Sequence, residues 1–426
     1  MLSLGIDIGT SGVRTAVLDG DTVVSSASAD HVPQTGDLDA TLWWDAVATC
    51  LHDQMAALDV LKVARTDISG IAVDGTSGSM VLTDADLNPV SPALMYNSKG
   101  FDAEAAQITP LAGDDHITSG SNSALARVLR LVNSATGTPR HLLHQADFIA
   151  AKLMGQGGHS DYNNSLKTGF DPGIERWPSW IGEVIDPSLL PSVHCPGDPV
   201  QPISNQIAQA FGLNPDAMVH AGTTDSIAAF LACAPMIEGT AVTSLGSTLA
   251  IKLLSKTRID DPKIGLYSHR LGDLWLVGGA SNTGGAVLKS FFTSEQLAAL
   301  SARIDPSQPS GLSYYPLLHS GERFPINDPD LAPQMEPRPS DDAEFLHGLL
   351  ESIALIEAKC YAEIKARGGE IPTVIYTAGG GSQNDIWAQI RSRHLSAQLE
   401  IAQSTEAAIG AARLASTLDP KISDAS

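Results

Sequence analysis

The sequence is poor in cysteine, and this shortage excludes two classes of protein. Four cysteines, Cys50, Cys195, Cys233 and Cys360, are scattered through 426 residues without a CxxC pair and without histidine at ligand spacing. This pattern is typical of reduced, mostly buried thiols. We therefore expect neither a disulfide framework nor a cysteine-based zinc site.

Basic residues and long apolar runs are also scarce. Lys and Arg total 26 against 48 Asp and Glu, a formal net charge of −22. Such a chain repels nucleic acid and anionic membranes, so we expect neither as a partner. The longest apolar run, near residues 228–237, is too short to span a bilayer. Met1 leads straight into a predicted strand, so we expect a cytoplasmic protein, or a plastid protein if a transit peptide was trimmed. We expect a monomer or a weak dimer.

Several familiar catalytic motifs are missing. The chain has no GxxxxGK[ST], no GxGxxG after a strand, no HExxH and no GxSxG before a helix. These absences argue against P-loop, nicotinamide, zinc-protease and α/β-hydrolase chemistry.

What the chain does contain is an alternation of short apolar runs with helical patterns, which indicates an α/β fold. The predicted strands lie in residues 2–9, 68–75, 219–224, 240–248, 274–282 and 373–381. The predicted helices lie in residues 42–58, 125–131, 146–153, 226–231, 343–367 and 406–414.

A hairpin opens the chain in LGIDIGTSGVRTAVLDG. The small residues 9–12 form a loop suited to phosphate, but alternating apolar residues follow it, so the loop joins two strands. The segment VTSLGSTLAIKLL, residues 242–254, has the same plan. Aligning Gly9 with Gly246 places Ser244 where Asp7 stands. The two segments suggest a duplicated domain that holds one phosphate chain; a chance likeness between short hairpins is the alternative.

Two carboxylates are candidates for chemistry. Asp7 ends a buried strand, where a carboxylate needs a partner. It either bonds to the backbone of its own turn or helps to hold Mg²⁺, and the neighbouring phosphate loop favours Mg²⁺. Asp225, in HAGTTDSIAAF, either caps the following helix or accepts the proton of a substrate hydroxyl. In isolation the cap is the better interpretation.

Two further segments place small residues at strand ends. In TAGGGSQNDIW, residues 377–387, three glycines permit close backbone approach, and Asn384 and Trp387 could bind and cover an adenine. A tight turn is the alternative. The segment DGTSGSM, residues 74–80, could line a polyol pocket.

The ordered motifs DIGTSGVR, TTDS, SLGST and AGGGSQN resemble the FGGY carbohydrate kinases of the actin-like ATPase superfamily, from Leu2 to about Leu414. The resemblance implies an α/β fold of two ribonuclease H-like (actin-like ATPase) domains hinged around a central cleft, residues 1–222 and 223–426. It also implies ATP and Mg²⁺ as cofactors, with the phosphoryl group of ATP passed to a small sugar.

The resemblance implies roles residue by residue. Catalysis falls to Asp225 as the base, with Asp7 and Thr10. Substrate binding falls to Asp7, Ser11, Gly12, Val13, Arg14, Ser77 and Asp225. ATP binding falls to Thr10, Gly246, Ser247, Thr248, Gly279, Gly379, Gly380, Gly381, Ser382, Gln383, Asn384 and Trp387. Asp7 would hold Mg²⁺, through water.

The sequence also departs from better-known family members. Xylulose kinases carry a Met-His pair in the loop that corresponds to DGTSGSM, and MYNSKG stands where glycerol and xylulose kinases have W-x-D-x-R. SDYNNSLKTGFD (160–171) and GERFPINDPD (321–330) are similar to the compact sugar kinases of cyanobacteria and plant plastids, described as acting on D-ribulose. We expect an ATP-dependent D-ribulose kinase. The alternatives are a D-xylulose or polyol kinase, or an actin-like ATPase scaffold without a sugar.

Overall fold

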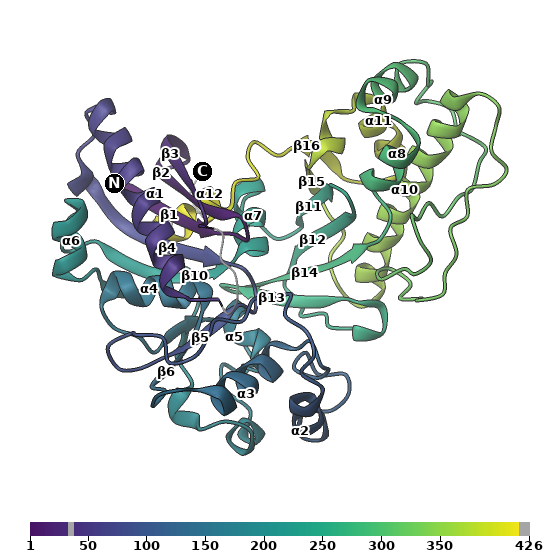
Figure 1. The fold of residues 1–426 in the computed structure, drawn as a ribbon. Helices are drawn as coiled ribbons and strands as arrows, with labels where there is room; N and C mark the ends of the chain where they lie inside the picture. Colours follow the sequence, from purple (N-terminus) through teal and green to yellow (C-terminus); the bar gives the residue numbers. More distant parts are fainter. Residues whose placement is uncertain (33–37, 417–426) are drawn as a thin grey trace. The chain divides into compact units, whose positions relative to one another are not determined.

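A computed structural model describes residues 1–32 and 38–416 and divides the chain into two compact units (Figure 1). Unit 1 comprises Met1–Ala232 and Glu406–Ser426, and unit 2 comprises Cys233–Thr405. The boundary predicted after residue 222 concerns functional domains and stays a prediction. By packing, residues 223–232 and the last helix belong with the N-terminal part of the chain.

Unit 1 contains most of the short elements. Its strands are β1 (Leu2–Ile8), β2 (Gly12–Asp19), β3 (Thr22–Asp30), β4 (Ile68–Gly75), β5 (Met80–Thr83), β6 (His141–His144), β7 (His159–Asp161), β8 (Ser192–His194), β9 (Pro199–Pro202) and β10 (Met218–Thr224). Its α-helices are α1 (Thr41–Leu61), α2 (Asp102–Ala112), α3 (Ala124–Ser134), α4 (Gln145–Met154), α5 (Tyr162–Lys167), α6 (Asn205–Phe211), α7 (Asp225–Cys233, whose last residue falls in unit 2) and α12 (Ala407–Ala415). Its 3₁₀ helices are η1 (Arg65–Asp67), η2 (Ser179–Glu183) and η3 (Pro187–Leu189).

Unit 2 is built from fewer and longer elements. Its strands are β11 (Thr240–Leu245), β12 (Leu249–Ser255), β13 (Tyr267–Leu271), β14 (Leu274–Ser281), β15 (Val374–Ala378) and β16 (Gln398–Ile401). Its helices are α8 (Gly285–Phe291), α9 (Ser294–Ser301), α10 (Asp342–Ala366) and α11 (Asp385–His394), with the 3₁₀ helices η4 (Pro262–Ile264) and η5 (Gly380–Gln383).

The principal sheets of the two units share one plan. The order is β3-β2-β1-β4-β10-β9 in unit 1 and β13-β14-β12-β11-β15-β16 in unit 2. In each, a central strand (β1 or β11) has an antiparallel hairpin partner on one side and a parallel strand on the other. The predicted α/β fold and the two predicted hairpins are confirmed, and the hairpin loops 9–11 and 246–248 occupy equivalent places.

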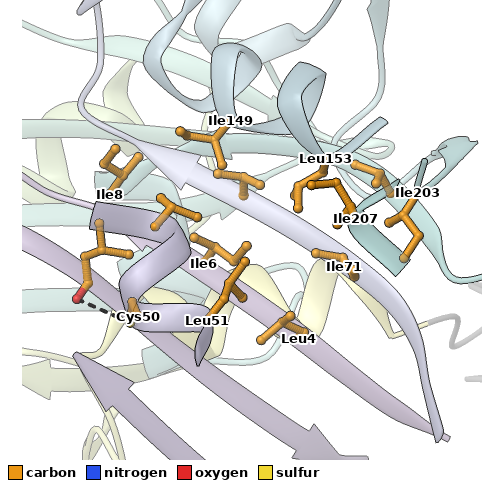
Figure 2. Packing of buried hydrophobic residues seen from close by; sticks show 14 of the residues in the cluster. Leu4, Ile6, Ile8, Cys50, Leu51, Ile71, Ile149, Leu153, Ile203 and Ile207 are labelled. Atoms are coloured by element: carbon orange, nitrogen blue, oxygen red, sulfur yellow. Dashed lines mark hydrogen bonds between the residues drawn. The ribbon is translucent and has the colours of Figure 1, made fainter. Parts of the chain in front are cut away.

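The core of unit 1 lies between its sheet and the helices α1 and α4. On β1, Leu4, Ile6 and Ile8 are fully buried, and Figure 2 shows them beside Leu51 of α1 and Ile149 of α4. Burying one such side chain contributes about 1.5–3 kcal/mol. Because β1 side chains alternate between two faces, Asp7 points to the face opposite this core.

The opposite face of the same sheet is covered by α12, which needs small residues beneath it. A side chain at Gly5 would come within 1.9 Å of the Ala408 carbonyl oxygen, and one at Gly70 within 2.1 Å of the Ala415 carbonyl oxygen. The sheet therefore accepts α12 only where glycine leaves room. Toward the carboxyl ends of β1 and β4, the same face carries Asp7 and Asp74.

In unit 2, α10 supplies the largest part of the core. Asp341 caps this helix by accepting the N–H of Ala343 at 3.2 Å. Most residues in the first four turns of α10 are buried, with Phe345, Leu349 and Ile353 among them, and the helix packs against α11 as well as the sheet.

Candidate functional site

Acidic side chains gather at the carboxyl ends of three parallel strands of unit 1. Asp7 of β1 pairs with Asp74 of β4, and Asp74 pairs in turn with Thr223 of β10. Asp225 follows β10 as the first residue of α7. Because parallel strands end at the same edge of a sheet, residues far apart in sequence converge here.

The carboxyl groups of Asp7 and Asp74 are hydrogen-bonded to each other and almost inaccessible, with 6% and 0% of these residues exposed. Among the described residues, no N–H or hydroxyl group donates to either Asp74 oxygen, so this bond needs a proton carried by one of the two carboxyls. Burial, followed by the charges of Asp7 and Asp225, raises the pKa of Asp74 well above its usual value. Burial also raises the pKa of Asp7, although the Asp74 bond and Arg14 oppose the rise.

Asp74 was not among the residues predicted for the site. The signal was present, because ISGIAVDG ends an apolar strand with a carboxylate just as LSLGIDIG does. Only the pairing of β1 with β4 makes that similarity meaningful.

Arg14 is the cation that faces this cluster. Its Nη1 lies 3.6 Å from Asp7 Oδ2, and its Nε lies 3.5 Å from Glu406 Oε2. Glu406 directly precedes α12 and was also missed by the sequence reading, because no local motif marks it. One guanidinium thus partly balances two carboxylates, and it is half exposed.

Asp225 lies within electrostatic range of both buried carboxyls, since its charge raises the pKa of Asp7 and of Asp74. Its Oδ1 accepts the N–H of Ser226 at 2.6 Å. The residue is partly exposed at the start of α7.

The hairpin loop beside Asp7 is short and closed by a bond from the Gly9 N–H to the Gly12 carbonyl at 2.9 Å. Thr10 and Ser11 are exposed and available to a ligand. Gly12 is explained by packing, since a side chain there would lie 2.4 Å from the Ala29 carbonyl oxygen. Val13 is 1% exposed within the core, so only its backbone could contribute to substrate binding.

Ser77 lies in the turn after β4 and is partly exposed. Its neighbours face inward: Thr76 Oγ1 donates to Gln145 Oε1 at 2.6 Å and is 2.6 Å from Ser79 Oγ. Among the residues between 74 and 80, Ser77 alone keeps some exposure.

The residues of unit 1 suit a magnesium ion that keeps most of its water. The described ranges contain no group of three or more His, Cys, Asp or Glu that could hold a metal ion. Mg²⁺ in phosphate chemistry usually takes one or two carboxylates, with water and phosphate oxygens completing its shell. Asp7 beside the Thr10–Ser11 loop fits that need.

In unit 2, the two predicted ATP segments meet. The hairpin loop 246–248 and the glycine loop 379–383 follow adjacent strands, and Gly379 has φ +82°. A side chain at Gly379 would lie 2.7 Å from the Leu245 carbonyl oxygen. Only glycine allows this approach of backbone to backbone. Ser247 and Thr248 are exposed on the same hairpin.

One side of the glycine loop is exposed to solvent, and the other side packs against the Trp387 ring. Gly380 and Gln383 are exposed and Ser382 partly so, and nothing lies within 4 Å of a side chain built at Gly380. Beneath, a side chain at Gly381 would lie 2.6 Å from the Trp387 ring.

Two predicted adenine contacts are placed differently from the sequence expectation. Trp387 is 2% exposed and its indole N–H donates to the Leu350 carbonyl at 3.0 Å, so its ring packs on the inner side of the glycine loop. Asn384 caps α11 by accepting the Trp387 N–H at 3.0 Å, and its amide group donates to Ser301 Oγ at 2.9 Å. Both the oxygen and the nitrogen of the Asn384 side chain are thus already engaged in hydrogen bonds within unit 2.

Gly279 does not join the two loops. It pairs with Ile251 inside the sheet, and a side chain there would lie 2.7 Å from the Phe324 ring, so packing explains this glycine. The glycine that the structure brings to the hairpin loop is Gly285, whose N–H donates to the Gly246 carbonyl at 2.9 Å.

Comparison with known proteins matches both parts of the chain to one family. The N-terminal domain of the FGGY family of carbohydrate kinases matches residues 2–125, and the C-terminal domain of the same family matches residues 241–418. None of the described helices is long and apolar enough to cross a membrane.

Individual relatives are similar over nearly the whole length. The xylulose kinase of Bacillus subtilis is 22% identical, over 97% of this chain and 87% of the relative. That of Streptomyces rubiginosus is 25% identical, over 98% and 88%. Among solved structures, the xylulose kinase from Rhodospirillum rubrum has a TM-score of 0.82 at 22% identity, covering 97% of this chain and 89% of that one. Plasmodium falciparum glycerol kinase with ADP has a TM-score of 0.80 at 14% identity, covering 97% and 88%.

Proposed function

Because the chain belongs to the FGGY family of carbohydrate kinases, we propose that it transfers the γ-phosphoryl group of ATP to the terminal hydroxyl of a ketopentose, with D-ribulose as the first choice. The observation that carries the proposal is the convergence of Asp7, Asp74 and Asp225 beside an exposed hairpin loop. A protein that only binds ATP through the loops of unit 2 does not need this cluster of carboxylates in unit 1.

In unit 1, the proposed division of labour follows from exposure and charge. Asp225 orients the acceptor hydroxyl and takes its proton as the O–P bond forms, help worth about 10²–10⁴-fold. Asp7, with Thr10, would hold Mg²⁺ through water, and the bound ion would neutralise charge on the transferred phosphoryl group. The exposed side chains of Ser11, Arg14 and Ser77, with the backbone at residues 12 and 13, are assigned to the sugar.

In unit 2, the proposal assigns ATP to the hairpin loop 246–248 and to residues 379–383. Backbone N–H groups of glycine-rich turns can bind phosphate oxygens without requiring positive side chains, which suits a chain of net charge −22. Gly380 offers open space for the adenosine part. Asn384 and Trp387 support this loop in the proposal, and Gly279 has no direct part.

D-Ribulose is supported by the loop DGTSGSM, which lacks the Met-His pair of xylulose kinases. A second candidate, D-xylulose, is favoured by the relatives, which are named xylulose kinases. Their identity of 22–26% leaves room for a change of sugar.

The test is a coupled assay of ADP release with D-ribulose, D-xylulose, L-ribulose and glycerol, each across a range of concentrations. We expect the highest kcat/KM with D-ribulose. A higher kcat/KM with D-xylulose would select the second candidate. ATP hydrolysis that no sugar accelerates would instead indicate an actin-like ATPase scaffold.

A further inference from the structure

A buried polar network lies near the ends of the two strands that lead into the loops of unit 2. Thr243 of β11 and Thr377 of β15 are paired neighbours on parallel strands, three and two residues before Gly246 and Gly379. Both threonines are buried, with 0% and 4% exposed. Both threonines therefore lie in the last few residues of the strands that lead into the loops assigned to ATP.

An ion pair joins these two hydroxyl groups. Arg391 of α11 donates from Nε to Glu357 Oε2 at 2.7 Å and from Nη2 to Glu357 Oε1 at 2.8 Å. Thr243 Oγ1 donates to Glu357 Oε1 at 2.6 Å and accepts from the Tyr361 hydroxyl at 2.8 Å. Arg391 Nη1 donates to Thr377 Oγ1 at 2.9 Å.

These five residues, called here the Glu357–Arg391 network, join two helices to two strands. Glu357 and Tyr361 come from α10, and Arg391 from α11, which begins directly after the glycine loop. Glu357 is 0% and Arg391 1% exposed. Because the bonds are directional and bidentate, they permit one relative placement of strands and helices.

Unit 1 contains an internal control for this network. The residues at the same distance before its hairpin loop are Ile6 of β1 and its partner Val73 of β4, both apolar and at most 1% exposed. The same sheet plan thus folds with an apolar layer at this place. The fold alone does not require threonine, glutamate and arginine here.

A buried ion pair is also a poor source of stability. Taking both charges out of water costs as much as their attraction returns, and well-packed apolar residues are often as stable, whereas removal of one partner is costly. What such a network adds is a unique arrangement of its neighbours.

We propose that the Glu357–Arg391 network consists of positioning residues that hold the hairpin loop 246–248 and the glycine loop 379–383 in the spacing needed by ATP. This inference rests on the proposed function, since it takes these loops as the nucleotide site. The backbones of the two loops approach so closely at Gly379 that a side chain built there would lie 2.7 Å from the Leu245 carbonyl oxygen. The distance between the two loops is therefore sensitive to a small shift of either strand.

The first experiment replaces the whole network by apolar residues, as unit 1 has them. The variant carries Thr243→Val, Glu357→Leu, Tyr361→Phe, Thr377→Val and Arg391→Met, so no polar partner is left unpaired. ATP and ADP dissociation constants are measured by calorimetry, together with the thermal midpoint and the KM of each substrate. We expect a similar thermal midpoint, nucleotide affinity about tenfold weaker, and an unchanged KM for the sugar.

A second, milder variant serves if the first does not fold. Thr377→Val keeps the shape of the side chain and removes only the acceptor of Arg391 Nη1. Its matched control is Thr15→Val in unit 1, where Thr15 is buried and donates to Gln54 Oε1 at 2.9 Å. We expect nucleotide affinity to fall about threefold or more in Thr377→Val and to stay unchanged in Thr15→Val.

The results separate the inference from the function on which it rests. If the wild-type protein binds no nucleotide, the proposed function itself is overturned. If the wild-type protein binds ATP and a folded apolar variant, or Thr377→Val, binds it equally well, the network is only structural and the inference is overturned. Weaker binding with a normal thermal midpoint supports positioning.

Discussion

Asp7 and Asp74 stand at paired positions of adjacent parallel strands, and their carboxyl groups share a hydrogen bond within a site that is nearly closed to solvent. Two carboxyls in such a place are stable only if one carries a proton or a cation lies near. Burying these two carboxyls therefore lowers the folding stability of the wild-type protein. Buried carboxyls with perturbed pKa values are often found at catalytic sites.

Asp74→Asn should stabilise the metal-free, nucleotide-free protein at neutral pH. The pKa of Asp74 is raised well above 3.8 in the folded chain, so the folded state binds a proton that the unfolded state releases. Wild-type stability consequently falls as pH rises above about 4, and an amide escapes this loss while still donating to Asp7. Thermal midpoints between about pH 4 and 8 should diverge as pH rises. A variant less stable than wild type at pH 7 would contradict the shared proton.

Asp7→Asn should remove the charge from the proposed magnesium position without removing the side chain. We expect turnover to fall by about 10²-fold or more, and the Mg²⁺ concentration needed for half-maximal rate to rise. ATP affinity measured without Mg²⁺ should change little, because the proposed nucleotide contacts lie in unit 2. Normal turnover with a normal Mg²⁺ requirement would show that Asp7 serves only the fold.

Asp225→Asn distinguishes a general base from a helix cap. The amide oxygen can still accept the N–H of Ser226, so the thermal midpoint should change little. It cannot accept the hydroxyl proton, so sugar phosphorylation should fall by about 10²-fold or more while nucleotide binding persists. Rate, ATP affinity and thermal midpoint are measured on one preparation. A folded variant with a near wild-type rate would leave Asp225 as a cap alone.

Gly380→Val tests the glycine loop. Nothing lies within 4 Å of a side chain built at Gly380, so the variant should fold with a normal thermal midpoint while it obstructs the open side of the loop. Nucleotide affinity should fall by about tenfold or more. The control is Gly381→Val, which would meet the Trp387 ring at 2.6 Å and should lower the thermal midpoint. Unchanged nucleotide affinity in a folded Gly380→Val variant would remove this loop from the proposed site.

Local patterns were sufficient for the main strands and helices of this protein, but not for other elements such as β3, α2 and α6. Alternating apolar residues around small-residue loops identified both hairpins, and the strands and helices predicted from periodicity are present in the described residues. Asp7 and Asp225 were found as candidates because a carboxylate at the end of an apolar strand, or before a helix, is conspicuous in a short window.

The tertiary structure alone decided which residues stand together. Asp74 gains meaning from its register with Asp7, and Glu406 reaches Arg14 because α12 packs on the first sheet. The burial of Trp387 beneath the glycine loop could not be foreseen from its motif, and the packing of Phe324 explained Gly279. The physical reason is the same in each case. Periodicity reports which face of an element is apolar, but the partner across that face is chosen by packing between residues far apart in the chain.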